Sequence, residues 1–125
     1  MDALDVTTAS LEANGRTITI VNLVGYLDSH TAPKFLDAMD AVIHQGTVNI
    51  IVDMAEVNYM SSAGFGVLAG TLGRLEDKQG TLIVAGLSDK LNRIFETLGL
   101  VHMIHVEPDR HLALDAFKAL ADPEG

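Results

Sequence analysis

The sequence has no cysteine and few basic residues, and both absences limit what the protein can do. Without cysteine, the chain can form no disulfide and use no thiolate chemistry. Eight Lys and Arg stand against 17 Asp and Glu, which gives a formal net charge of −9 at pH 7. Such a surface repels nucleic acid and anionic lipid. We therefore expect no nucleic-acid partner, and instead a protein partner with a basic docking surface.

Long apolar runs are also missing. No run approaches the roughly 20 residues that a transmembrane helix needs, so we expect no direct membrane insertion. The acidic N-terminal segment lacks the basic start and apolar core of a signal peptide, which favours a cytoplasmic location. The 125 residues are 48% hydrophobic, and this predicts one domain with a genuine core. We expect that domain to span residues 1–125 and to end in a flexible tail at 121–125.

Segments with the pattern of strands alternate with segments of helical period. We predict strands at 5–13, 16–24, 48–52, 81–85 and 101–106, and helices that begin near 33, 62, 89 and 109. Asn14-Gly15, between the first two strands, is a strong hairpin signal. The order ββαβαβαβα predicts an α/β fold with a largely parallel sheet.

The most informative segment covers residues 48–75. A short apolar strand is followed by a polar turn, and Ser61-Ser62-Ala63-Gly64 then begins a helix. A phosphate is well tolerated at a helix start, because unpaired backbone N–H groups and the helix dipole both favour negative charge there. The sequence thus directs a serine hydroxyl outward at a position suited to phosphate.

Three segments together resemble the STAS domain of bacterial anti-sigma factor antagonists. They are Gly-Tyr-Leu-Asp-Ser-His-Thr-Ala at 25–32, the segment 52–68 that contains Tyr-Met-Ser-Ser-Ala-Gly-Phe-Gly, and Phe-Glu-Thr-Leu-Gly-Leu at 95–100. Their order and spacing also match, so the resemblance covers nearly the whole chain. It implies a single STAS domain with a mixed, largely parallel β-sheet and helices packed on one face.

In that family, a partner kinase phosphorylates the serine that precedes a small residue and a glycine. That position is Ser62 here. Many members have Asp where this chain has Ser61, and Ser or Thr often stands in place of Ala63. The resemblance therefore identifies Ser62 as the phosphorylation site, with Ser61 and Ala63 as partner-binding neighbours. The alternative is that Ser61 or Ser62 only caps the helix.

Two aspartates follow strand ends. If the family fold holds, Asp28 lies near Ser62, where it either orients the loop or contacts the partner; alternatively, it only caps the first helix. Asp53 has the position of the phosphoacceptor in a response-regulator receiver. The chain lacks the adjacent acids and the lysine which that chemistry needs, so we expect Asp53 to cap the turn instead.

The second helix carries an unusual number of glycines. At 100° per residue, one side collects small residues and the opposite side collects large apolar ones. The small side contains Ser62, Gly66, Ala69, Gly70 and Gly73, and the apolar side contains Phe65, Leu68, Leu72 and Leu75. Each interior glycine costs roughly 1 kcal/mol against alanine in an exposed helix. The small side therefore allows another helix to approach closely, either a partner's or a neighbouring helix of the same domain.

No catalytic or metal-binding pattern is present. The five histidines are not spaced as metal ligands, and His102 and His105 would point to opposite faces of an extended segment. The glycine patterns of dinucleotide and phosphate loops are incomplete, and no Ser-His-Asp set can be recognised. We expect no enzyme activity, no metal and no cofactor.

The resemblance implies a regulatory switch. Unmodified protein would bind an anti-sigma factor that is also a serine kinase, and so free the sigma factor. Phosphorylation of Ser62 would end that binding, and a serine phosphatase would restore it; ATP and Mg²⁺ belong to the kinase. The alternative is a STAS subunit that does not switch and serves as a scaffold or as part of a transport complex.

Overall fold

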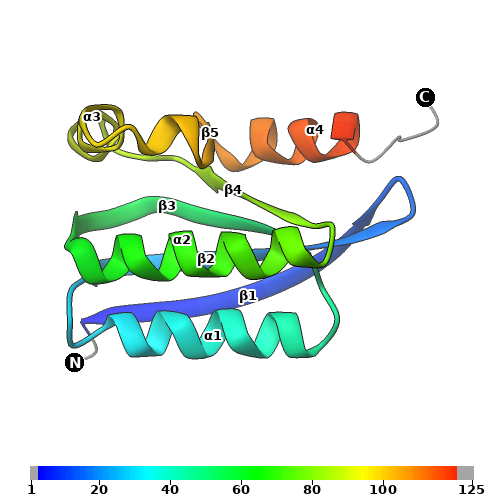
Figure 1. The fold of residues 1–125 in the computed structure, drawn as a ribbon, viewed down its shortest axis with the longest axis horizontal. Coiled ribbons are helices and arrows are strands. Elements are labelled where there is room, and N and C mark those ends of the chain that lie inside the picture. Colours follow the sequence, from blue (N-terminus) through cyan, green and yellow to red (C-terminus); the bar gives the residue numbers. More distant parts are fainter. Residues whose placement is uncertain (1–2, 121–125) are drawn as a thin grey trace.

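The computed structural model describes residues 3–120, so the tail expected at 121–125 lies outside the described residues. Strands and helices follow one another in the predicted order (Figure 1). The elements are β1 (Leu4–Ala13), β2 (Arg16–Leu27), α1 (Ala32–His44), β3 (Asn49–Met60), α2 (Ser62–Asp77), β4 (Thr81–Ala85), α3 (Asp89–Thr97), the 3-10 helix η1 (Leu100–His102), β5 (His105–Glu107) and α4 (Arg110–Leu120). Within this range, no helix is both long and apolar enough to cross a membrane.

The five strands form one sheet in the order β1-β2-β3-β4-β5. β1 and β2 are antiparallel, and each later strand is parallel to its neighbour. The predicted hairpin is confirmed: Asn14 and Gly15 both have positive φ, 53° and 78°, as a type I′ turn requires. The sheet is therefore mixed and largely parallel, as expected.

The helices cover both faces of the sheet, which differs from the expectation that all lie on one face. α1, α2 and α3 pack on the face that carries Val52 and Val84, whereas α4 packs on the face that carries Ile51 and Ile83. Strands that are apolar at consecutive positions need cover on both sides. Ala113 and Phe117 supply it, since α4 buries both of them over the second face.

β3 extends eight residues beyond the predicted strand at 48–52. The expected polar turn is instead extended backbone that pairs with β2 as far as Met60. Val57 and Met60 are buried there, while Glu56, Asn58 and Tyr59 are exposed. Two register shifts, between Asn22 and Val24 and between Gly25 and Tyr26 of β2, break the alternation of buried and exposed residues. Because of that irregularity, the hydrophobic periodicity of the sequence does not predict the second half of β3.

Two other boundaries differ from the prediction. β2 continues through Gly25 to Leu27, and Gly25 adopts a φ of +126° where a Cβ would lie 2.2 Å from the Ala3 carbonyl oxygen. The strand expected at 101–106 is η1 followed by the three-residue β5. Gly99, with a φ of 72°, ends α3 and starts this tight turn.

A buried threonine on α2 provides a stability test. The Thr71 hydroxyl is buried and has no hydrogen-bond partner in residues 3–120. Since an unsatisfied buried hydroxyl costs about 1 kcal/mol or more, Thr71→Val should raise the free energy of unfolding by about that amount. Thr19→Val is the matched control and should lower it, because the buried Thr19 hydroxyl bonds Ser10 Oγ at 2.8 Å. Urea titration measures both, and a less stable Thr71→Val protein would contradict the assignment.

Candidate functional site

Ser62 is the first residue of α2 and is exposed. Ser61 precedes it in extended conformation, with φ −96° and ψ 175°, at the N-cap position. The Ser61 side chain makes no capping hydrogen bond, and the Ser62 hydroxyl makes no hydrogen bond to any of residues 3–120. Neither hydroxyl is therefore engaged in capping α2. The Ser62 hydroxyl is open to solvent and to a partner.

The backbone around Ser62 favours an added anion. The Ser61 carbonyl accepts hydrogen bonds from Gly64 N at 3.0 Å and Phe65 N at 3.4 Å. The N–H groups of Ser62 and Ala63 have no acceptor within the described part of the chain. These two donors point out of the helix start, where the dipole is positive. A phosphate on Ser62 would thus sit next to unpaired donors and need not break an existing bond.

Close packing fixes where α2 begins. Gly64 is buried, and a Cβ there would lie 3.1 Å from Leu27 Cβ and from Met60 Cγ and Cε. The absence of a side chain lets the first turn of α2 lie directly on the ends of β2 and β3. The Ser61 N–H also donates to the Leu27 carbonyl at 2.8 Å, which joins the two strand ends. The structure therefore places the Asp28 turn beside the start of α2.

Asp28 organises its own turn. Its Oδ1 accepts hydrogen bonds from His30 N at 2.8 Å and Thr31 N at 3.0 Å, and the Thr31 hydroxyl accepts one from Asp28 N at 2.9 Å. Partial desolvation of the carboxylate raises its pKa, but the N–H donors of Thr31 and His30 outweigh this effect and hold the Asp28 pKa below its usual value. Asp28 thus orients the loop as a capping aspartate does, although α1 itself begins later, at Ala32.

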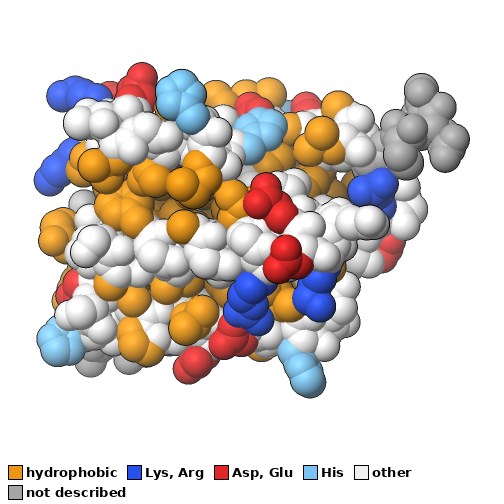
Figure 2. All heavy atoms as spheres, in the orientation of Figure 1, with side chains coloured by type: hydrophobic (Ala, Val, Ile, Leu, Met, Phe, Trp, Pro, Cys, Tyr) orange, Lys and Arg blue, Asp and Glu red, His pale blue; other side chains and the backbone are white. Residues whose placement is uncertain are grey.

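The glycine side of α2 faces away from the rest of the domain. Gly66, Gly70 and Gly73 are exposed, and a Cβ at any of them would meet no atom within 4 Å. The alternative that these glycines admit a neighbouring helix of the same domain is therefore wrong. Figure 2 shows α2 crossing this face as a mostly white band between hydrophobic side chains above and below it. We refer to Gly66, Gly70 and Gly73 as the glycine strip.

The opposite side of α2 holds the helix in place. Leu68, Leu72 and Leu75 are buried as predicted, whereas Phe65 is only half-buried. Its ring packs edge-to-face on Phe95 of α3, with ring centroids 5.4 Å apart. The first turn of α2 is therefore anchored on both the sheet and α3, while its outer side stays bare.

Asp53 has a partner that the sequence did not reveal. Its Oδ1 accepts a hydrogen bond from Ala55 N at 3.0 Å, at a register shift inside β3 and not in the turn that was expected there. Its Oδ2 also accepts one from Arg110 Nε at 2.8 Å, and another nitrogen of Arg110 donates to Asn22 Oδ1 at 3.1 Å. Arg110 lies 57 residues away in the sequence, so no local pattern indicates the pair. The Asp53 carboxylate ties α4 to the second face of the sheet and is not free for other chemistry.

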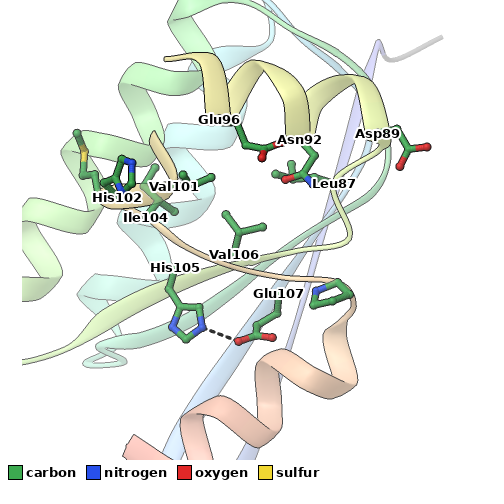
Figure 3. A pocket seen from close by; sticks show the side chains of 12 residues that line it. Leu87, Asp89, Asn92, Glu96, Val101, His102, Ile104, His105, Val106 and Glu107 are labelled. Atoms are coloured by element: carbon green, nitrogen blue, oxygen red, sulfur yellow. Dashed lines mark hydrogen bonds and ion pairs between the residues drawn. The ribbon is translucent and has the colours of Figure 1, made fainter. Parts of the chain in front are cut away.

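A hollow of about 910 Å³ lies between α3, η1 and β5, and Ser62 does not line it. Figure 3 shows Asn92 and Glu96 directed into it from α3, with Val106 on its floor. On β5, His105 Nε2 and Glu107 Oε2 are 2.5 Å apart. No group of three or more His, Asp or Glu among the described residues could hold a metal ion. The hollow therefore contains no metal-binding group among the described residues.

A family model described as the STAS domain matches residues 8–113 of the chain. An anti-sigma-B factor antagonist of Listeria monocytogenes is 36% identical over 85 residues, which are 68% of this chain and 75% of the relative.

Solved structures show the same fold. An anti-sigma factor antagonist from Mycobacterium paratuberculosis superposes with a TM-score of 0.76 at 26% identity, covering 90% of this chain and 93% of that one. SpoIIAA, an anti-sigma factor antagonist of Bacillus, is similar in both of its forms. The unphosphorylated form has a TM-score of 0.70 at 20% identity over 91% of this chain and 98% of that one. The phosphorylated form has a TM-score of 0.68 at 22% identity, over 90% of this chain and 99% of that one.

The turn at Asp28 predicts a pH-dependent effect. A carboxylate whose pKa is lowered on folding stabilises the protein above the usual carboxyl pKa, and that contribution is lost as the pH falls through the folded-state pKa. Asp28→Ala should therefore be less stable than wild type near neutral pH, and the difference should shrink in acid. Asp37→Ala, at an exposed position of α1, is the control and should leave stability unchanged. Urea unfolding over a pH series measures this, and a difference that does not change with pH would contradict it.

Proposed function

The chain belongs to the STAS domain family, and on that premise we propose that it is an anti-sigma factor antagonist switched by phosphorylation of Ser62. The observation that carries the proposal is the position of Ser62, an exposed hydroxyl without a hydrogen bond at the start of α2. Its role is regulatory binding rather than catalysis. The relative from Listeria, which is named as an anti-sigma-B factor antagonist, supports this assignment.

In the proposed cycle, unphosphorylated protein binds an anti-sigma factor that is also a serine kinase, and the sigma factor is released. The kinase brings ATP and Mg²⁺. The Ser62 Oγ then forms a bond to the γ-phosphorus of ATP, and the bond from that phosphorus to the bridging oxygen of ADP breaks. ADP stays on the kinase, and the hydroxyl proton passes to the kinase or to water. A serine phosphatase hydrolyses the phosphoserine and restores the binding form. The cycle takes place in the cytoplasm, where sigma factors act.

We assign the docking surface to the exposed side of α2 and the turns beside it. It comprises Asp28, Ser61, Ser62 and Ala63 together with the glycine strip. The strip supports the assignment because its helix backbone is bare along about two turns, from Gly66 to Gly73, which permits close approach by a partner element. Asp28 lies on the adjoining turn and contributes negative charge to the same end of the sheet.

Phosphorylation should alter binding and leave the fold intact. A phosphate adds about −1.5 to −2 charge, and the start of α2 has two unpaired N–H donors to receive it. The domain already carries a net charge of −9, so a partner suited to it is basic. At the centre of the docking surface, where the unmodified hydroxyl fits, the added phosphate then excludes the partner by its bulk and by local charge repulsion. SpoIIAA, which has this fold, is known in a phosphorylated form, and this supports a phosphate that leaves the fold intact.

The first test maps the phosphate. The kinase, identified by its binding to the unmodified chain, is incubated with the protein and ATP, and the product is analysed by mass spectrometry. We expect one phosphate on Ser62, none on Ser62→Ala, and continued phosphorylation of Ser61→Ala. Phosphate on Ser61 alone, or a fully modified Ser62→Ala protein, would refute the assignment.

The same site is then tested for switching. Ser62→Asp should melt at or slightly above the wild-type temperature, because a negative charge at a helix start contributes a few tenths to about 1 kcal/mol in favour of folding. It should nevertheless bind the kinase much more weakly. Unchanged affinity would favour a STAS subunit that does not switch, and a large loss of thermal stability would mean that the charge disrupts the fold.

The glycine strip yields a paired prediction. Gly70→Ala should raise the free energy of unfolding by up to roughly 1 kcal/mol, since a better helix former replaces glycine on an open face. Gly70→Leu should also fold, but its side chain should hold a partner away and weaken kinase binding. Ala119→Leu adds the same side chain to an exposed position of α4 and is the binding control. If Gly70→Leu binds as well as Ala119→Leu, the strip is not part of the docking surface.

A further inference from the structure

The outer edge of β1 is long and regular, and most of its outward backbone groups are uncovered. β1 is a terminal strand of ten residues, paired with β2 without a register shift, whereas β5 at the opposite edge has only three. Four consecutive residues, 7–10, are exposed, and the strand contains no proline, glycine or lysine. Natural proteins usually protect an edge of this length with bulges, proline or lysine, because its free backbone groups accept another strand. β1 has none of these devices.

The hydrogen-bond pattern shows which backbone groups face outward. Tyr26 N donates to the Ala3 carbonyl at 3.1 Å, so Ala3 bonds to β2. In an antiparallel pair the residues that bond to the neighbour alternate with residues that face away. The even-numbered residues of β1 therefore face the open edge. Leu4 agrees with this, because Lys34 Nζ reaches its carbonyl oxygen from outside at 2.8 Å.

We propose that this edge pairs antiparallel with β1 of a second copy of the chain. Since Lys34 occupies the Leu4 carbonyl, the available outward residues are Val6, Thr8, Ser10 and Glu12. A two-fold axis that uses all four must pass beside Ala9. Thr8 then pairs with Ser10 of the second copy, and Val6 with Glu12. The two five-stranded sheets become one continuous sheet.

Side chains and charges in this register suit a second copy. At the axis, Ala9 lies opposite Ala9 of the other copy in a pair without mutual hydrogen bonds, where side chains approach most closely and a small residue fits. Asp5 lies opposite Ala13, and Glu12 lies opposite Val6. No acid faces an acid, although the chain carries a net charge of −9. Thr8 and Ser10, directly opposed, form a polar cross-strand pair of the kind that stabilises sheets.

The dimer leaves the Ser62 site open. α2 begins at the end of β3, two strands in from the β1 edge, and α4 packs over β3, β4 and β5 on the second face. Both copies can therefore present Ser62 and the glycine strip to partners. The interface and the phosphorylation switch are separate, and either can fail without the other.

Thr8→Pro tests the interface directly. Proline removes the outward N–H of Thr8 and its ring blocks an approaching strand, while the bonds between β1 and β2 remain. Sedimentation velocity over a concentration series should show a dimer for wild type and only monomer for Thr8→Pro, with the same circular dichroism spectrum. Wild type that stays monomeric at its solubility limit, or a folded Thr8→Pro protein that still dimerises, would overturn the proposal.

Charged substitutions at Ala9 test the register of the dimer. They also test whether the dimer forms through β1 if Thr8→Pro does not fold. Ala9→Lys and Ala9→Glu each place like charges opposite one another at the axis, and each should dimerise severalfold more weakly than wild type. An equimolar mixture should form a heterodimer more tightly than either variant alone. Ala119→Lys, at an exposed position of α4, should dimerise as wild type does. A mixture no tighter than its separate components would show that Ala9 does not lie on the axis.

Discussion

The parallel pairing of β2 with β3 determines the geometry of the Ser62 site. It runs from Ile18 and Asn49 to the ends of both strands, where the Ser61 N–H donates to the Leu27 carbonyl. That last bond brings the Asp28 turn next to the start of α2, although the two lie more than thirty residues apart in the sequence. It also fixes the direction in which α2 leaves the sheet. Without it, the unpaired donors at Ser62 and Ala63 would have no defined orientation.

α2 combines two requirements that conflict in most helices. Its inner side, with Leu68, Leu72 and Leu75, is buried in the core. Its outer side carries the glycine strip, and each of these glycines costs about 1 kcal/mol in helix propensity without gaining a contact inside the domain. A helix selected for stability alone would have alanine there. The domain therefore tolerates a weaker helix, and this is understandable if the bare backbone is needed at an interface.

Much of the fold follows from local patterns, and the differences have physical causes. The Asn14-Gly15 hairpin and the order of elements could be predicted, because each depends on neighbouring residues. The second half of β3 was missed because two bulges in β3 itself, opposite Asn22–Val24 and Gly25–Tyr26 of β2, disturb its alternation. The position of α4 and the Arg110–Asp53 pair depend on contacts far apart in sequence. At the site, Ser62 was recognisable by resemblance, but the engagement of Asp28 with its own turn required coordinates.

The architecture keeps a modification at Ser62 local. The inner contacts of α2 lie on the opposite side of the helix from the hydroxyl, and Phe65 on Phe95 and Gly64 on the strand ends hold the first turn in place. An added phosphate meets unpaired N–H groups rather than buried side chains, so it gains interactions without displacing any. A change confined to the surface can alter only what binds there. Rigid packing beneath Ser62 and an exposed surface above it are therefore the two features that the proposed switch requires.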